Sequence, residues 1–156
     1  MLKPRRGSDS IGLRLVRAGP LPARLRSQRM IAQEQARGAE LTIAVLGGCV
    51  GAPLRILLPE GVPYSFGRKY VLRPGRAPLE DAALAARVRR TARAIVEALG
   101  VDWAARIDLI HDHGADRLVF LECDAAPLVG PRSAFAASLA AAGLPRDEQL
   151  RRLLRE

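Results

Sequence analysis

The sequence predicts an α+β domain whose sheet is largely antiparallel and flanked by helices. Strand-like segments come first, one long amphipathic helix follows, and two more strands joined by a turn come after it. Strands grouped before and after a helix, without strict alternation, are typical of α+β domains. A length of 156 residues with 49% hydrophobic residues suits one domain with its own core.

The first third of the chain predicts short strands separated by breaks. Residues 1–16, "MLKPRRGSDSIGLRLV", indicate a strand edge, a Gly/Ser loop and a second strand, and a short helix is expected near 21–28. In residues 29–48, "RMIAQEQARGAELTIAVLGG", we expect a strand, a turn at Gly38 and a strongly β-prone strand from Leu41 to Leu46.

The rest of the chain predicts a loop-rich segment, a helix, a hairpin and two final helices. Residues 53–78 hold five of the eleven prolines and indicate a strand at "RILLP" and a long loop carrying "YSFGRKY". A helix is expected over 79–99, ending at Gly100, and Ala-rich helices near 132–142 and 146–155. The apolar stripe of the long helix has spacings of four, seven and four: Leu84, Val88, Ile95 and Leu99.

The predicted hairpin, residues 105–127, places carboxylates among apolar residues in "ARIDLIHDHGADRLVFLECDAAP". Strand side chains alternate between faces, so Arg106 and Asp108 share one face of the first strand. Glu122 and Asp124 share one face of the second strand for the same reason. If the register pairs the two polar faces, three carboxylates converge.

Two interpretations of the converging carboxylates stay open at this point. Like charges repel unless a cation lies between them, and a hard divalent ion such as Mg²⁺ or Mn²⁺ takes oxygen ligands. The alternative is a solvated polar face that pairs with Arg106 and Arg117. Alternation of charged residues is common on exposed strands, so spacing alone favours neither.

Four other side chains of reactive types are interpreted as structural. His111 and His113 fall in the predicted hairpin turn and are expected to be solvated there. Cys49 and Cys123 lie far apart in apolar surroundings without metal-ligand spacing, so we expect buried, reduced thiols.

The net charge of +9 is not interpreted as a nucleic-acid signal. The 25 cationic residues are scattered and aromatic content is 4%, so nucleic acid is not an expected partner. No apolar run has the length of a membrane span and the basic start lacks an apolar signal core, so we expect a cytoplasmic protein with no membrane partner. The only lysines are Lys3 and Lys69.

Five segments occur in an order and at distances that resemble a known family: "KPRRGSDSIGL", "ELTIAVLGG", "GRKY", "ARIDLI" and "FLECDAAP". They resemble the nucleotide-binding portion of D-alanine-D-alanine ligases, in the ATP-grasp superfamily. The resemblance covers nearly the whole chain and implies a partial ATP-grasp fold, residues 1–156, lacking the family's N-terminal domain. It implies a glycine-loop and nucleotide-binding subdomain over 1–48. A C-terminal subdomain with the ω-loop and metal site would span 49–156.

The resemblance implies phosphate contacts in the N-terminal loop and in the ω-loop. Lys3 matches a lysine that reaches the phosphates of ATP, and Lys69 matches the ω-loop lysine near the γ-phosphate. An ammonium acts on phosphate as a point charge. Ser8 and Ser10 belong to the loop that resembles the family's glycine loop, where Asp9 stands at a position that is usually serine.

The resemblance also implies contacts to the nucleoside and to the second substrate. Gln33 or Glu34 matches an adenine-side polar contact, and Glu40 matches the acid that binds the ribose hydroxyls. Tyr70 matches the tyrosine that favours D-alanine as second substrate, and Ser133 matches a serine that binds that substrate's carboxylate.

In the hairpin, the resemblance favours the metal interpretation. Arg106 matches the arginine that stabilises the oxyanion, and Asp108, Glu122 and Asp124 match the Mg²⁺ ligands. The family has a glycine where this chain has Leu128, and leucine resists positive φ.

The function implied is ATP-dependent ligation of a carboxylate to an amine. One D-alanine, or a similar small amino acid, is activated as an acyl phosphate and attacked by the amine of a second, which forms a dipeptide for peptidoglycan precursors. The alternative is a non-catalytic ATP- and Mg²⁺-binding remnant, or a subunit that needs a separate N-terminal half. A homodimer or that separate half are the protein partners expected.

Overall fold

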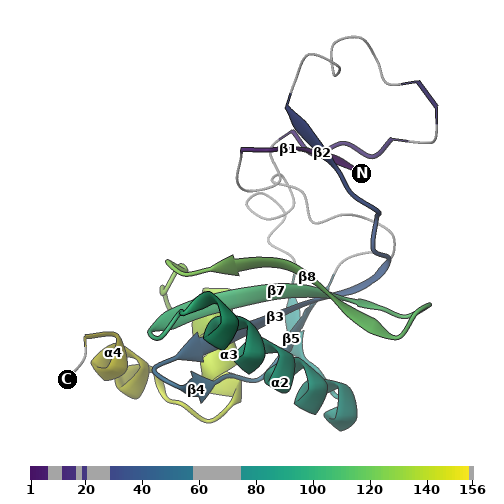
Figure 1. Cartoon of the computed structure of the whole chain (residues 1–156). Coiled ribbons are helices and arrows are strands. Elements are labelled where there is room, and N and C mark those ends of the chain that lie inside the picture. Colours follow the sequence, from purple (N-terminus) through teal and green to yellow (C-terminus); the bar gives the residue numbers. More distant parts are fainter. Residues whose placement is uncertain (7–11, 17–18, 21–28, 58–74, 155–156) are drawn as a thin grey trace. The chain divides into compact units, whose positions relative to one another are not determined.

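A computed structural model describes residues 1–6, 12–16, 19–20, 29–57 and 75–154, in two compact units (Figure 1). The described residues of the first unit lie within 1–36, and those of the second within 37–57 and 75–154. The boundary expected between residues 48 and 49 falls inside the second unit, in the turn after strand β3. The division into subdomains 1–48 and 49–156 stays a prediction.

The described part of the first unit contains a two-stranded antiparallel sheet. Strand β1 (Leu2–Pro4) pairs with β2 (Met30–Ala32), with Lys3 opposite Ile31. The strand expected at the end of residues 1–16 is reduced to one isolated bridge, between Arg14 and Leu2. The helix expected at 21–28 lies outside the described residues.

The second unit is built on an antiparallel sheet, which confirms the predicted fold class. The strand order is β6-β5-β3-β7-β8, and β4 pairs with the end of β3. The predicted hairpin is β7 and β8, and its first strand also pairs along the whole of β3. The strands are β3 (Gly38–Leu46), β4 (Cys49–Val50), β5 (Leu54–Ile56), β6 (Arg76–Pro78), β7 (Ala104–Asp112) and β8 (Arg117–Asp124).

Gly38 does not form the predicted turn. It is the first residue of β3, opposite Asp112 of β7, with φ of 155°. A Cβ at this position would collide with the carbonyl oxygen of His111. The glycine is therefore needed because two backbones approach closely, and this reason cannot be distinguished from a turn in the sequence.

Helix α2 (Ala82–Leu99) covers one face of this sheet (Figure 1). It begins three residues later than predicted, because the Asp81 side chain accepts a hydrogen bond from the Leu84 amide as N-cap. The predicted end is confirmed, since Gly100 adopts a left-handed φ of 65°. Of the expected stripe, Leu99 is exposed, and the fully packed positions are Val88, Ala92 and Val96.

Helix α3 (Ala134–Ala141) packs on the other face, and α4 (Arg146–Leu154) follows it. Phe135 and Leu139 of α3 are fully buried against Ala44 and Leu46 of β3. The buried hydroxyl of Ser138 accepts from the Ala44 amide and so ties α3 to the strand. None of the described helices is long and apolar enough to cross a membrane.

Candidate functional site

The polar faces of β7 and β8 meet beside α3, and the expected convergence of their side chains is confirmed. Arg106 lies opposite Asp124, and Asp108 lies opposite Glu122. Residues directly opposite each other in antiparallel strands project from the same face of the sheet. Three carboxylates and one guanidinium therefore gather on a single surface.

A β-bulge in β8 makes this gathering possible. The register shifts between Asp108 and Leu109, whose partners are Glu122 and Phe120, so Leu121 is an extra residue without a partner. Before the bulge, Leu118 packs toward α2. If Leu121 were instead paired with Asp108 in an unbroken ladder, the even-numbered positions of β8 would all share that face. The bulge instead turns Glu122 toward the opposite face, as bulges near functional sites commonly do.

Arg106 is the centre of the arrangement and is only 8% exposed. Its Nη2 lies 3.0 Å from Asp108 Oδ2 and 3.2 Å from Glu122 Oε1, and its Nη1 lies 3.4 Å from Asp124 Oδ2. Burial lowers the pKa of Arg106, but the charges and hydrogen bonds of the carboxylates outweigh it and leave the pKa above its ordinary value. The guanidinium is therefore cationic at every working pH.

One of the two open interpretations is thus present in the structure, in altered form. The polar face does pair with Arg106, as the second interpretation required. The Arg117 Nε lies 3.2 Å from Asp112 Oδ2, at the tip end of the same hairpin.

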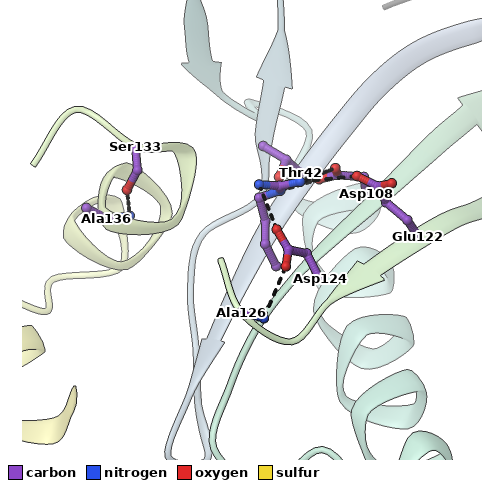
Figure 2. A network of polar contacts seen from close by, with 8 residues as sticks. Thr42, Asp108, Glu122, Asp124, Ala126, Ser133 and Ala136 are labelled. Carbon is purple, nitrogen blue, oxygen red and sulfur yellow. Dashed lines mark hydrogen bonds and ion pairs between the residues drawn. The ribbon is translucent and has the colours of Figure 1, made fainter. Parts of the chain in front are cut away.

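Thr42 belongs to the network and was missed by the sequence analysis. It lies on β3 opposite Asp108, is 3% exposed, and its Oγ1 donates a 2.7 Å hydrogen bond to Asp108 Oδ1 (Figure 2). The available signal was a single hydroxyl within the apolar run "LTIAVL". A buried polar group needs a partner, but the sequence alone does not name that partner.

Two capping contacts hold the chain that leaves the network. Asp124 Oδ1 accepts from the Ala126 amide at 3.1 Å, so its other oxygen faces Arg106 (Figure 2). Further on, Ser133 is the N-cap of α3, and its Oγ accepts from the Ala136 amide at 3.1 Å. The Ser133 hydroxyl hydrogen is available for a ligand, because Oγ is only an acceptor in this contact.

The donor chemistry of the network suits a hard divalent cation. Carboxylate oxygens are the ligands that Mg²⁺ takes, and three carboxylates exceed the charge of the one guanidinium between them. The side chains of Glu122 and Asp124 are 51% and 34% exposed, so solvent reaches the edge of the network. Within the described ranges, however, no group of three acidic, His or Cys side chains is arranged to hold a metal ion. The carboxylates are directed at Arg106 instead.

The other predicted site residues divide among three places. Glu40 is on β3 two residues before Thr42, which puts it on the face of the network. Lys3, Gln33 and Glu34 belong to the first unit, whose position relative to the second is not determined. The remaining predicted site residues lie outside the described residues: Ser8, Ser10, Lys69 and Tyr70.

The expectation that both histidines lie in the turn is wrong for His111. His111 is in β7, its side chain is only 13% exposed, and its Nε2 lies 3.0 Å from Asp116 Oδ1. Asp116 also pairs with Arg87 of α2 at 2.7 Å. Hydrogen bonds from Arg87 and then from His111 lower the pKa of Asp116 far below its ordinary value. Asp116 therefore joins the hairpin tip to Arg87 of α2 and to His111 of β7.

The two cysteines are free, as expected, and both are half-buried. Cys123 lies opposite Ile107 and packs toward α2, away from the carboxylates beside it in sequence. Burial, and then the charges of Asp124 and Asp108, raise the pKa of the Cys123 thiol. A thiol with a raised pKa carries little thiolate and is a poor nucleophile.

Comparison with known proteins identifies the family to which this chain belongs. The family model for the D-ala D-ala ligase C-terminus matches residues 1–155. The chain belongs to this ligase family. The membership that the five sequence segments predicted is therefore confirmed, and so is the ATP-grasp fold that goes with it.

Relatives of this ligase family match over most of the chain. A D-alanine-D-alanine ligase of Kineococcus radiotolerans is 31% identical over 174 residues, which is 98% of this chain and 46% of that protein. Among solved structures, a Bacillus anthracis D-alanine-D-alanine ligase has a TM-score of 0.69 at 20% identity, covering 99% of this chain and 52% of that one. Another, complexed with ATP, has a TM-score of 0.61 at 20% identity over 82% and 39% of the two chains. The chain spans about half the length of the curated relatives it matches.

Proposed function

We propose that this chain provides the ATP- and metal-binding part of an ATP-dependent carboxylate-amine ligase that joins two D-alanine molecules, or similar small amino acids, for peptidoglycan precursors. The observation that carries the proposal is the network of Arg106 with three carboxylates on one sheet face, in a chain of this ligase family. A cytoplasmic location, and the absence of nucleic-acid and membrane partners, stay predictions.

In this proposal the residues of the network position reactants. Asp108, Glu122 and Asp124 would hold Mg²⁺ or Mn²⁺, which would neutralise charge on the nucleotide phosphates, and ATP would supply the phosphoryl group that activates a substrate carboxylate. Arg106 stabilises the negative charge that develops on the carbonyl oxygen during attack. The Arg106 side chain is held in one orientation, because three carboxylates pair with its guanidinium and the residue is buried. No protein nucleophile is required.

The other predicted residues would bind the nucleotide and the second substrate. Lys3 and Lys69, with the loop of Ser8 and Ser10, would neutralise the phosphates. Gln33, Glu34 and Glu40 would bind the nucleoside. Ser133 would donate its hydroxyl hydrogen to the second substrate's carboxylate, a contact that its N-cap geometry leaves available. Tyr70 would favour an amino acid over a hydroxy acid as that substrate.

A second candidate is an ATP- and Mg²⁺-binding chain that does not catalyse ligation alone. Two observations favour it. Leu128, at a family glycine position beside the network, is 67% exposed. In addition, the described carboxylates face Arg106 and are not arranged around a common metal position. This candidate would act with a separate N-terminal half or would retain binding only.

Calorimetry of the full chain with a nonhydrolysable ATP analogue tests both candidates at their common step. We expect binding that requires Mg²⁺, and Glu122→Gln with Asp124→Asn should weaken it at least about tenfold by removing two metal-binding charges. Asp112→Asn is the matched control, because it removes an acidic charge from the same hairpin at its far end. Unchanged binding in the double variant, or none in the folded wild type, would refute the metal-nucleotide site.

Turnover separates the two candidates. The chain is mixed with ATP, Mg²⁺ and D-alanine, alone and together with the N-terminal half of the Kineococcus radiotolerans relative. Dipeptide and phosphate released by the mixture would support the ligase. Nucleotide binding without dipeptide in either sample would favour the second candidate.

A further inference from the structure

The loop between β8 and α3 is held mainly by polar contacts. Residues 125–132 join Asp124 of the network to Ser133, the N-cap of α3. Within this loop Pro127 is buried and the other residues are exposed. A loop with few buried apolar contacts opens easily unless hydrogen bonds fix it. The position of Ser133 therefore depends on the groups that hold this loop.

Arg146 of α4 reaches the middle of the loop. Its Nη2 donates a 2.7 Å hydrogen bond to the Val129 carbonyl, and its Nη1 donates to Gln149 Oε1 at 3.2 Å. A second arginine, Arg76 of β6, donates to the Arg132 carbonyl at 2.8 Å, but both of these residues are exposed to solvent. Arg146 is half-buried and is also held by Gln149, so its contact with the loop is the better fixed of the two.

Gln149 connects Arg146 to the helix turn that follows Ser133. The Gln149 side chain is 1% exposed, and its Nε2 donates to the carbonyls of Ala136 at 3.2 Å and Leu144 at 2.9 Å. The Ala136 amide in turn donates to Ser133 Oγ at 3.1 Å. All the hydrogen-bonding groups of the Gln149 amide are thus used, which gives it one orientation. Arg146 and Gln149 together hold the chain on both sides of Ser133: the loop before it and the first turn of α3 after it.

Neither helix stability nor an ion pair explains an arginine at position 146. Arg146 is the first residue of α4, where a cation opposes the helix macrodipole. Among the described carboxylates, none pairs with Arg146, whereas Arg151 of the same helix pairs with Asp147. The Arg146 guanidinium instead makes its hydrogen bonds to the loop and to Gln149.

We propose that Arg146 is a positioning residue for the second substrate, because it holds the loop and the helix turn that present Ser133. The inference rests on the proposed function, in which the Ser133 hydroxyl binds the carboxylate of a second D-alanine or similar amino acid. Arg146 does not touch that substrate. It fixes the Val129 carbonyl through a charge-assisted hydrogen bond, which is stronger than a neutral one, and fixes Ala136 through Gln149. A binding group displaced by only about 1 Å loses much of its effect.

Hydrogen–deuterium exchange of the full chain tests whether Arg146 holds the loop. Arg146→Met keeps the apolar stem and removes the guanidinium, so exchange in peptides that cover residues 125–133 should become about tenfold faster. Arg151→Met is the matched control, because the Arg151 guanidinium pairs with Asp147 and Glu148 of α4 itself. Circular dichroism checks folding, and Arg146→Gln replaces Arg146→Met if the latter does not fold. Equal exchange in the Arg146 variant and the control would overturn the proposal.

Turnover tests the link to the substrate, in a mixture of the chain with the N-terminal half of the Kineococcus radiotolerans relative. We expect Arg146→Met to raise the apparent KM for D-alanine about fivefold or more, because the carboxylate contact is misplaced. The kcat and the KM for ATP should stay within about twofold of the wild type. Arg146→Lys keeps the charge but lacks the planar fork that reaches both Val129 and Gln149, so its KM for D-alanine should stay raised. Full recovery in the lysine variant would overturn the positioning role, since charge alone would then attract the substrate.

Failure of this inference and failure of the proposed function give different results. If the wild-type mixture forms dipeptide but Arg146→Met leaves the KM for D-alanine unchanged, the inference is overturned even if the loop exchanges faster. The same holds if the variant raises the KM values for ATP and D-alanine equally, because the effect would then be a general loosening of the fold. If the wild-type mixture forms no dipeptide, the proposed function fails and the substrate role of Arg146 is overturned with it.

Discussion

The two faces of the second unit's sheet are built from the same strands but have different compositions. Toward α2, strands β3 and β7 present only apolar side chains at their centres, including Ile43, Ile107 and Leu109, all at most 1% exposed. Toward α3, the same strands are apolar at one end, where Leu46 meets Phe135. Further along the same face, they carry the polar residues Thr42, Arg106 and Asp108.

The difference between the two faces explains how a small domain can tolerate a cluster of charged side chains. A group such as Arg106 with three carboxylates contributes little net stability, because desolvation opposes the ion pairing. The apolar face has no such cost and supplies most of the free energy of folding. One face therefore stabilises the fold, and the polar half of the other is available for chemistry.

The largest expected effect comes from opening a cavity on the α2 face. Ile107→Ala should lower the free energy of unfolding by about 3 kcal/mol or more, because Ile107 is completely buried. Ile110→Ala, the same change three residues along β7 at a half-buried position of the other face, is the control and should cost less. Urea unfolding measures both, and equal losses would contradict the difference between the faces.

Removing the central cation should be the next largest effect. Arg106→Gln leaves three carboxylates without a countercharge, so we expect a loss of about 2 kcal/mol, below the range for fully buried pairs because the acids are partly exposed. Adding Mg²⁺ should recover part of this stability in the variant and less in the wild type. A variant as stable as the wild type in metal-free urea titrations would show that the ion pairs contribute nothing.

Removing the buried hydroxyl should have a smaller effect. Thr42→Val keeps the shape of the side chain but takes away the donor to Asp108, which should cost about 1 kcal/mol. Thr42→Ser retains a hydroxyl and serves as the control in the same urea titrations. If valine were as stable as threonine, Asp108 would be held by Arg106 alone.

The smallest expected effect concerns the hairpin tip and depends on pH. The pKa of Asp116 is lowered by Arg87 and His111, so its stabilising contribution is present above the unfolded pKa of about 4 and is lost as pH falls through the folded pKa. Asp116→Asn should therefore be less stable than the wild type at pH 6, and the two should converge as the pH approaches 2. A constant difference across this range would show that the Asp116 charge is not responsible.

Much of the site's framework could be predicted because it depends on local periodicity. Alternation in "ARIDLI" and "FLECDAAP" was sufficient to put Arg106 and Asp108 on one face of β7, and Glu122 and Asp124 on one face of β8. The cap at Gly100 followed from its position after an amphipathic stripe. These features are decided by neighbours within one strand or one turn of helix.

The features that could not be predicted depend on contacts between distant segments. Gly38 has the composition of a turn, and only the approach of β7 explains it. Thr42 gains its role from a residue 66 positions away. The position of Arg106 among the carboxylates requires the cross-strand register, which a single strand does not specify.

Because Leu121 is an extra residue without a partner, the number of residues in β8 decides which of its side chains face α2 and which face the network. Between the hairpin tip and the carboxylates, an insertion or deletion of two residues preserves which side chains face α2 and which face the network. A change of one residue exchanges the two sets, and would send Glu122 and Asp124 toward the apolar core. Homologous or engineered versions of this hairpin are therefore expected to vary in length only by even steps, unless they also lose the bulge.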